Sequence, residues 1–155
     1  MTVSDSRFAG ENPDESGPRL ASALREAGYS QFTFTLVPDE TAAIQEAILA
    51  MCHKCTAIFT TGGTGFAPKD LTPEATQPLI ERPAPNLSEL MRLAGHRDTP
   101  FAHLSRGVAG LRGGTLIVNL PGSPAAVVSG IKALAPLLPH LFETLADSQP
   151  GHPRC

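Results

Sequence analysis

Cysteine, aromatic residues and excess charge are scarce in this sequence of 155 residues, and each shortage excludes a class of protein. Three cysteines are too few for a disulfide framework. The lack of tryptophan and the single tyrosine argue against surfaces that stack on nucleic-acid bases or on sugars. Lys and Arg number 12 against 15 Asp and Glu, so no basic field would attract nucleic acid or an anionic membrane.

Long apolar runs are also missing. No run approaches the roughly 18 to 20 apolar residues that cross a bilayer, and no N-terminal segment has the character of a secretory signal. We therefore expect a cytoplasmic protein that binds neither membrane nor nucleic acid. Its 41% hydrophobic and 17% charged residues are typical of a globular chain. We expect a single domain over 1–147 and a polar C-terminal tail over 148–155.

The chain is organised around a glycine-rich stretch, Thr-Thr-Gly-Gly-Thr-Gly, which ends at Gly65. A short apolar run before it predicts a strand over 57–61, and Thr72, Pro73 and Glu74 after it predict a helix start with Thr72 as the N-cap. Three glycines in four residues let backbone N–H groups converge on an anion, and the helix would add its positive end. The stretch predicts an anion-binding loop with Asp70 at its rim, and a tight turn without a ligand is the alternative.

Two common phosphate loops can be excluded. A Walker loop needs a Gly-Lys pair followed by Ser or Thr, but Gly65 is followed by Phe66 and no such pair occurs before Asp70. A dinucleotide-binding fingerprint would need a third glycine where this chain has Pro68. A less common phosphate loop that brings its own carboxylate remains.

Apolar periodicity and turn residues predict alternating strands and helices along the chain. We expect a loop over 8–18, strands over 1–3, 32–37, 57–61, 105–110 and 115–120, and helices over 20–27, 40–52, 73–81, 87–94 and from 124 onward. The last helix should kink at Pro136 and Pro139. This pattern predicts an α/β fold of three layers, α/β/α, with a mostly parallel sheet, helices on both faces and a small β-hairpin. Ligands of such sheets bind at the carboxyl ends of the strands.

Two acidic residues are expected at that edge of the sheet. Asp39 follows the strand over 32–37, and Asp70 lies beside the glycine-rich stretch. Two carboxylates beside a phosphate loop suggest Mg²⁺, which prefers one or two carboxylates together with substrate phosphates. For Asp39, a simple helix N-cap is the alternative interpretation.

Two other polar residues keep two interpretations each. Arg106 is either a phosphate partner or an ordinary solvated charge at a strand end. Ser123, between Gly122 and Pro124, is either the N-cap of the last helix or a hydroxyl that meets a ligand.

A Cys-x-x-Cys pair, Cys52 and Cys55, has the spacing of metal ligands, and His152 with Cys155 could in principle complete a zinc site. The first pair lies at a helix end and the second in the expected tail. We interpret these cysteines as incidental.

Six segments converge on one known family. They are Thr2-Val3-Ser4-Asp5, Asp14-Glu15-Ser16-Gly17-Pro18, Pro38-Asp39-Glu40, Thr60 to Thr76, Leu104-Ser105-Arg106 and Ile117 to Pro124. Together they resemble the molybdopterin adenylyltransferases, the Mog and MoaB family, which is related to the gephyrin G domain. The resemblance covers nearly the whole chain in the right order.

The resemblance implies a domain, usually trimeric or hexameric, that transfers AMP from Mg-ATP to molybdopterin and releases pyrophosphate during molybdenum cofactor biosynthesis. It also implies a molybdenum insertase as a partner, and a non-catalytic molybdopterin carrier of the MoaB type is the alternative function. Carried over by motif, Asp39 and Asp70 match catalytic or Mg²⁺-associated positions. The positions that match substrate and phosphate-binding segments are Ser4, Asp5, Ser16, Gly17, Thr61, Gly62, Gly63, Thr64, Gly65, Arg106, Gly122 and Ser123.

This chain departs from the family pattern at three places. Met1 stands almost on the first motif, whereas the family normally has several more strand residues, so either the first strand is shortened or the start is misassigned. Thr56 occupies a position that is often acidic in the family, and Lys69 replaces a common Arg, which keeps the charge but loses the planar fork of guanidinium donors.

Overall fold

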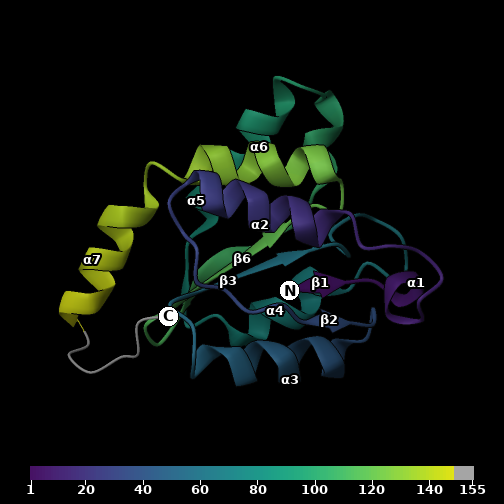
Figure 1. Ribbon diagram of the computed structural model, residues 1–155, viewed down its shortest axis with the longest axis horizontal. Coiled ribbons are helices and arrows are strands. Elements are labelled where there is room, and N and C mark those ends of the chain that lie inside the picture. Colours follow the sequence, from purple (N-terminus) through teal and green to yellow (C-terminus); the bar gives the residue numbers. More distant parts are fainter. Residues whose placement is uncertain (149–155) are drawn as a thin grey trace.

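One six-stranded sheet organises residues 1–148, which are the residues that the computed structural model describes (Figure 1). The strand order is β2-β1-β3-β6-β5-β4. The strands are β1 (Thr2–Val3), β2 (Leu36–Val37), β3 (Ala57–Thr61), β4 (Arg82–Pro83), β5 (Ala109–Arg112) and β6 (Thr115–Leu120). Strands β2, β1, β3 and β6 are parallel, while β5 runs antiparallel to both β6 and β4. The expected mostly parallel sheet with a β-hairpin is confirmed.

Helices cover both faces of this sheet, as expected (Figure 1). They are α1 (Asp5–Phe8), α2 (Ser16–Glu26), α3 (Thr41–Cys52), α4 (Thr72–Thr76), α5 (Pro85–His96), α6 (Pro124–Leu134) and α7 (Leu138–Ser148), with 3₁₀ turns η1 (Gln77–Leu79) and η2 (Pro100–Leu104). Alternate β3 side chains enter two cores: Ile58 packs with α3 and α4, and Phe59 packs with α2, α5 and α6. Burial on both faces explains why β3 and β6 each carry three consecutive apolar residues, at 57–59 and 116–118.

The strand order reverses direction at β1. The chain passes from β1 to β2 on one side of it, and then to β3 on the other side. Where the connections from two neighbouring strands run in opposite directions, they diverge at the carboxyl ends of those strands. α/β proteins bind ligands between such diverging connections. Ser4 and Gly62, which follow β1 and β3, begin this edge.

Several expected boundaries are wrong. The strand expected over 32–37 is reduced to β2 at Leu36–Val37, and the strand expected over 105–110 is β5 at Ala109–Arg112. The loop expected over 8–18 is shorter, because α1 ends at Phe8 and α2 begins at Ser16. The helix expected over 73–81 ends at Thr76 and continues as a 3₁₀ turn to Leu79.

The expected kinked C-terminal helix is two helices. α6 ends at Leu134 and α7 begins at Leu138, with a 61° bend between them, because proline at 136 cannot supply a helical N–H bond. α7 runs to Ser148, so the first residue of the tail expected over 148–155 is helical. His152 and Cys155 lie outside the described residues.

The amino group of Met1 is buried beside β3, where it donates a hydrogen bond to the Phe59 carbonyl at 2.8 Å. Burial lowers the pKa of this amino group from 8.0 to about 6, and the charges of Asp14 and Cys55 oppose that shift. Between pH 6 and pH 8 this amino group is protonated in the unfolded chain and mostly neutral in the folded chain, so the unfolded chain binds more protons. We therefore expect the free energy of unfolding to rise by about 2 to 3 kcal/mol from pH 6 to pH 8.

Urea unfolding across this pH range measures the effect. Protein acetylated at the Met1 nitrogen is the control, because its amide can still donate to Phe59 but carries no charge. The acetylated protein should lose most of the pH dependence. An equal slope in both forms would attribute the effect to other groups.

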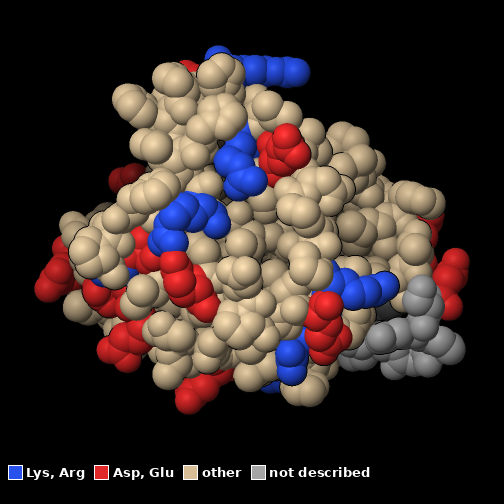
Figure 2. All heavy atoms as spheres, turned by 180° about the vertical axis from the view of Figure 1, so that it is seen from behind, with Lys and Arg blue, Asp and Glu red and all other residues tan. Residues whose placement is uncertain are grey.

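Among residues 1–148 no single helix has both the length and the composition of a membrane span, although the bent pair of α6 and α7 meets these two criteria jointly. On the face seen in Figure 2, basic and acidic side chains are interspersed. This distribution agrees with the formal net charge of −3.

Candidate phosphate-binding site

The glycine loop, residues 62–65, follows β3 and depends on backbone conformations that glycine adopts most easily. Gly62 has φ +101° and Gly63 has φ +61°. A Cβ on Gly62 would overlap the carbonyl oxygen of Val3, and a Cβ on Gly122 would lie 3.3 Å from Gly62 Cα. The ends of β1, β3 and β6 therefore meet with backbone packed on backbone at Gly62.

The carbonyl and amide groups of this loop are used very differently. The Thr72 hydroxyl donates to Gly62 O at 2.9 Å, and the Thr72 amide donates to Gly63 O at 3.0 Å. Arg106 supplies the next two bonds, from its amide to Thr64 O and from Nε to Gly65 O. Within the described residues the amides of Gly63, Thr64 and Gly65 donate to no acceptor.

A loop whose carbonyls are bonded and whose amides are not presents partial positive charge to its surroundings. This is the arrangement expected of an anion-binding loop, and it disfavours the interpretation of a turn without a ligand. We expected the positive end of the following helix to contribute to anion binding, with Thr72 as its N-cap, and this detail is wrong. Thr72 is the first residue of α4 and not its N-cap, and its amide is already bonded within the loop.

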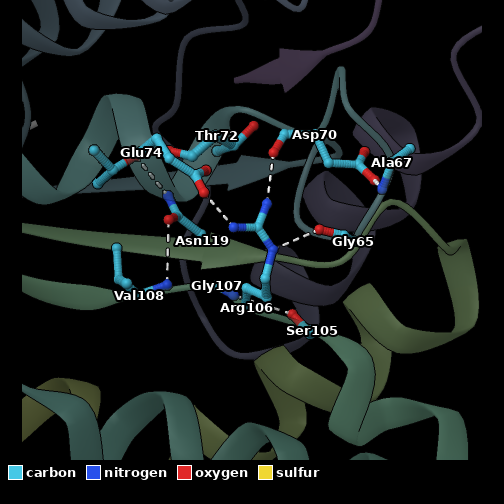
Figure 3. Close-up of polar contacts among 11 residues, drawn as sticks. Gly65, Ala67, Asp70, Thr72, Glu74, Ser105, Arg106, Gly107, Val108 and Asn119 are labelled. Atoms are coloured by element: carbon cyan, nitrogen blue, oxygen red, sulfur yellow. Dashed lines mark hydrogen bonds and ion pairs between the residues drawn. The ribbon is translucent and has the colours of Figure 1, made fainter.

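Arg106 braces the loop from the segment before β5 (Figure 3). Its Nε donates to Gly65 O and its Nη2 to Asp70 O, both at 2.6 Å, and its Nη1 pairs with the Glu74 carboxylate. The hydrogen bond from Arg106 lowers the pKa of Glu74. Both expected interpretations of Arg106, as a phosphate partner or a solvated charge, leave out this role, because the guanidinium holds the loop.

Asp70 closes the far side of the loop, where its Oδ2 accepts a hydrogen bond from the Ala67 amide at 2.8 Å. A Cβ on Gly65 would lie 2.8 Å from the same oxygen, so the carboxylate lies directly against the loop. Its Oδ1 accepts no hydrogen bond from the residues described. Asp70 is therefore at the rim of the loop, as expected.

Asp39 approaches the loop from the end of β2. Its Oδ2 accepts a hydrogen bond from the Asp5 amide at 2.9 Å, and the Asp39 amide donates to Asp5 Oδ1 at 2.8 Å. A Cβ on Gly63 would lie 3.2 Å from Asp39 Oδ1. The N-cap interpretation is wrong: Glu40 occupies the cap position of α3, and no side chain caps that helix.

Asp39 and Asp70 interact electrostatically across the loop. Burial is the main cause that raises the pKa of Asp39, and the negative charges of Asp5 and Asp70 add to it, while the Asp5 amide and Lys69 oppose it. Two carboxylates, each with one oxygen that accepts no hydrogen bond from residues 1–148, suit Mg²⁺, which takes few protein ligands and completes its shell with water and phosphate. No group of three or more His, Cys, Asp or Glu side chains in residues 1–148 forms a metal cage.

The other predicted site residues lie in three places. Thr61 donates from its hydroxyl to Pro121 O at 2.7 Å, which links the loop to the segment that holds Gly122. Ser123 stands at the cap position of α6, but its exposed hydroxyl makes no capping bond. Ser4 lies at the end of β1 and its Oγ is 3.4 Å from Ser6 Oγ.

Ser16 and Gly17 are placed differently, at the start of α2. The Ser16 hydroxyl and the Gly17 amide both donate to Asp14 Oδ1, at 3.1 and 2.9 Å. Asp14 also accepts from the Thr2 hydroxyl, so its carboxylate joins α2 to β1. No bond in the described residues connects Ser16 or Gly17 to the glycine loop, and their predicted substrate role stays a prediction.

Sequence reasoning missed the residues that hold the site from outside the loop. The buried Asn119 amide donates to the hydroxyls of Thr60 and Thr76. Its Oδ1 accepts from the Val108 amide (Figure 3). A polar residue in the otherwise apolar strand β6 was a usable signal, because a buried amide needs partners. Nothing in the sequence indicated that Thr72 would donate hydrogen bonds to the carbonyls of the glycine loop.

The Cys-x-x-Cys pair lies on the opposite edge of the sheet. The backbone carbonyls of Cys52 and Cys55 accept from the Thr115 hydroxyl, and burial raises the pKa of the Cys52 thiol. Nothing in residues 1–148 groups three metal-binding side chains at this place.

Comparison with known proteins identifies the family. Residues 1–140 match the family described as "Probable molybdopterin binding domain". The chain is 35% identical over 149 residues to the molybdopterin adenylyltransferase of Helicobacter pylori, covering 94% of this chain and 85% of that protein. The MoaB structure from Thermus thermophilus superposes with a TM-score of 0.88 at 44% identity, covering 94% of this chain and 93% of that one.

Some relatives are much longer than this chain. The molybdenum cofactor synthesis protein cinnamon of Drosophila melanogaster is 41% identical over 150 residues, which cover 95% of this chain but 25% of that protein. The chain spans 48% of a bifunctional molybdenum cofactor biosynthesis protein from Synechococcus elongatus. Because the family match covers most of the chain, the protein belongs to the molybdopterin-binding domain family of molybdenum cofactor biosynthesis.

Proposed function

We propose that this protein is a molybdopterin adenylyltransferase that uses ATP and Mg²⁺. The observation that carries the proposal is the glycine loop, whose three unbonded amides lie between the carboxylates of Asp39 and Asp70. Relatives named molybdopterin adenylyltransferase support this choice of reaction.

In the proposed reaction, a terminal phosphate oxygen of molybdopterin attacks the α-phosphorus of ATP. A new P–O bond forms, the bond between the α-phosphorus and the bridging oxygen breaks, and pyrophosphate leaves with that oxygen. The amides of Gly63, Thr64 and Gly65 would donate to phosphoryl oxygens and stabilise their charge as it develops. No protein nucleophile is needed, since the substrate supplies the attacking oxygen.

Asp39 and Asp70 are the residues that would hold Mg²⁺ in this site. The bound cation would neutralise charge on the phosphates. Burial is the main cause of the raised pKa of Asp39, and the negative charges of Asp5 and Asp70 add to it. A divalent cation between the carboxylates of Asp39 and Asp70 would offset the repulsion between them.

Pyrophosphate release by the purified protein tests the proposal, with molybdopterin, ATP and Mg²⁺ each omitted in turn. Release that requires all three components, with adenylylated pterin as co-product, is the expected result. Pterin binding without release would favour the second candidate, a non-catalytic molybdopterin carrier. That candidate rests on the likeness to MoaB and on a family description that specifies binding.

Arg106 should act as a positioning residue for the glycine loop. In R106A the carbonyls of Gly65 and Asp70 lose their donor, so we expect the KM for ATP to rise about 10-fold with a smaller change in kcat. R106K should recover only part of the affinity, because an ammonium cannot reproduce the planar fork.

The control is E74Q, which removes one partner of Arg106 and leaves both carbonyl bonds. It should change the KM for ATP by less than about 3-fold, because the Arg106–Glu74 pair is largely exposed. If R106A lowers kcat without raising KM, Arg106 acts on the chemical step and does not merely position the loop.

We also propose the cellular setting that the resemblance implies: a cytoplasmic homotrimer or hexamer that hands its product to a molybdenum insertase. Exposed apolar side chains on α5 and η2 support self-association, since Leu93 is 54% and Phe101 73% exposed. The bifunctional relative supports a partner in the same pathway. Sedimentation velocity of the purified protein would measure the assembly.

A further inference from the structure

Phe66 follows the glycine loop directly and is a large apolar side chain that the fold leaves in the open. It is 72% exposed. The three residues before it, Gly63, Thr64 and Gly65, are those whose amides donate to no acceptor within residues 1–148. A single exposed phenylalanine is common on protein surfaces and identifies no site by itself. Phe66 differs from the ordinary case because its position is fixed, next to a candidate anion site.

The backbone around Phe66 is held on both sides. On one side Arg106 Nε donates to Gly65 O at 2.6 Å. On the other side the Ala67 amide donates to Asp70 Oδ2 at 2.8 Å. Consecutive Cα atoms are only about 3.8 Å apart, so Phe66 stays close to both bonded neighbours. A side chain on a loop braced in this way loses little further conformational freedom when a ligand contacts it.

The Phe66 ring also has a fixed cation over one face. The guanidinium carbon of Arg106 lies 5.6 Å from the ring centroid. This guanidinium donates to Gly65 O and Asp70 O and pairs with Glu74, so three groups hold it in place (Figure 3). A cation over an aromatic face is attracted to the ring at this separation. Arg106 therefore orients the ring, whose exposed part remains accessible to a ligand.

An aromatic face beside a phosphate-binding loop suits a ligand that has both a phosphate and a planar ring. The phosphate would bind the loop amides, and a nitrogen heterocycle joined to it by a short linker would stack on Phe66. Stacking of this kind accepts different heterocycles, because each of them has a π face. A phosphate without a ring would contact the amides alone.

We propose that Phe66 is the stacking surface for a planar nitrogen heterocycle of a phosphorylated substrate. The inference rests on the proposed function and deepens it, because it names a residue that recognises the ring. Both substrates of the proposed reaction contain such a ring, adenine in ATP and the pterin in molybdopterin. Phe66 binds the ring and takes no part in the chemical step.

The test compares F66L with the unsubstituted protein. Dissociation constants are measured with Mg²⁺ present for ATP, molybdopterin and inorganic triphosphate. Leucine keeps an apolar side chain but has no aromatic face, so we expect one of the two ring-bearing ligands to bind F66L about 10-fold more weakly. Triphosphate has no ring, and its affinity should change by less than about 2-fold. Weaker ATP binding assigns the surface to adenine, and weaker molybdopterin binding assigns it to the pterin.

F66Y and F34L are matched controls. F66Y keeps the aromatic face and should bind the same ligand within about 2-fold of the unsubstituted protein. Phe34 is 62% exposed and precedes β2, outside the glycine loop, so F34L should bind all three ligands normally. NMR gives a second readout, since an aromatic ring shields protons that lie over its face. Ring protons of the bound heterocycle should shift upfield with F66Y and not with F66L.

Equal affinities of F66L and the unsubstituted protein for both ATP and molybdopterin would overturn the proposal. A loss of triphosphate affinity in F66L as large as the loss for the ring-bearing ligand would overturn it too, because Phe66 would then only shape the loop. None of these readouts needs turnover. If pyrophosphate release fails while F66L still weakens a ring-bearing ligand selectively, the proposed reaction is contradicted and the stacking surface is supported.

Discussion

Replacing Asp70 by asparagine is expected to slow ATP-dependent pyrophosphate release at saturating substrate by about 100-fold or more. Asparagine has the same shape, and its carbonyl oxygen can still accept the bond from the Ala67 amide that closes the loop. The variant therefore removes the charge and keeps the geometry. Affinity for molybdopterin, measured by fluorescence titration without ATP, should change by less than about 3-fold, since the loss falls on the transition state.

D98N is the matched control for this experiment. Asp98 follows α5 and lies outside the glycine loop, and its loss of charge should leave turnover unchanged. If D70N turns over at the normal rate, Asp70 has no part in the reaction and the carboxylate only shapes the loop. If D70N loses pterin affinity to the same degree as turnover, its role is in binding.

Replacing Gly62 by alanine is expected to destabilise the protein by about 3 kcal/mol or more, which lowers the melting temperature of a chain of this size by roughly 6 to 12 °C. Two costs add. The residue has φ +101°, which L-amino acids rarely adopt, and the new Cβ would overlap the Val3 carbonyl oxygen. Turnover should fall as well, because relief of the overlap would displace the loop from β1.

G28A separates these two costs. Gly28 has a similar φ of +93°, but a Cβ there would meet nothing within 4 Å. The conformational cost alone should be about 1 to 2 kcal/mol. Thermal unfolding of both variants gives the difference, which measures the contact with Val3. Equal melting temperatures for G28A and G62A would show that the sheet accommodates the extra methyl group.

The class of fold could be predicted because it depends on local patterns. Short apolar runs that alternate with helical periodicity require buried strands covered by helices, and β3, β6 and α3 appear where these patterns placed them. The extent of β2 could not be predicted. Phe32 and Phe34 have strand character, but a strand also needs a neighbour to bond with, and β1 is too short to supply one.

The candidate site also has one part that could be predicted from the sequence and one part that could not. Glycines at 62 and 63 after a buried strand predicted a tight glycine-rich loop, and both residues have a positive φ. Arg106 and Asp39 each kept two interpretations, because nothing near them in the sequence identifies their partners. Arg106 bonds to Gly65, 41 residues away, and Asp39 bonds to Asp5, 34 residues away.

By itself, the sequence determined that this chain forms a mostly parallel sheet covered by helices, with a glycine-rich loop after β3, because periodicity and glycine conformation act over a few residues. The tertiary structure decided which groups surround the loop. Only the strand order β2-β1-β3-β6 brings Asp39, Asp70 and Arg106 to one edge. The physical reason is that a hydrogen bond depends on distance in space, and the order of strands in a sheet sets that distance independently of their separation along the chain.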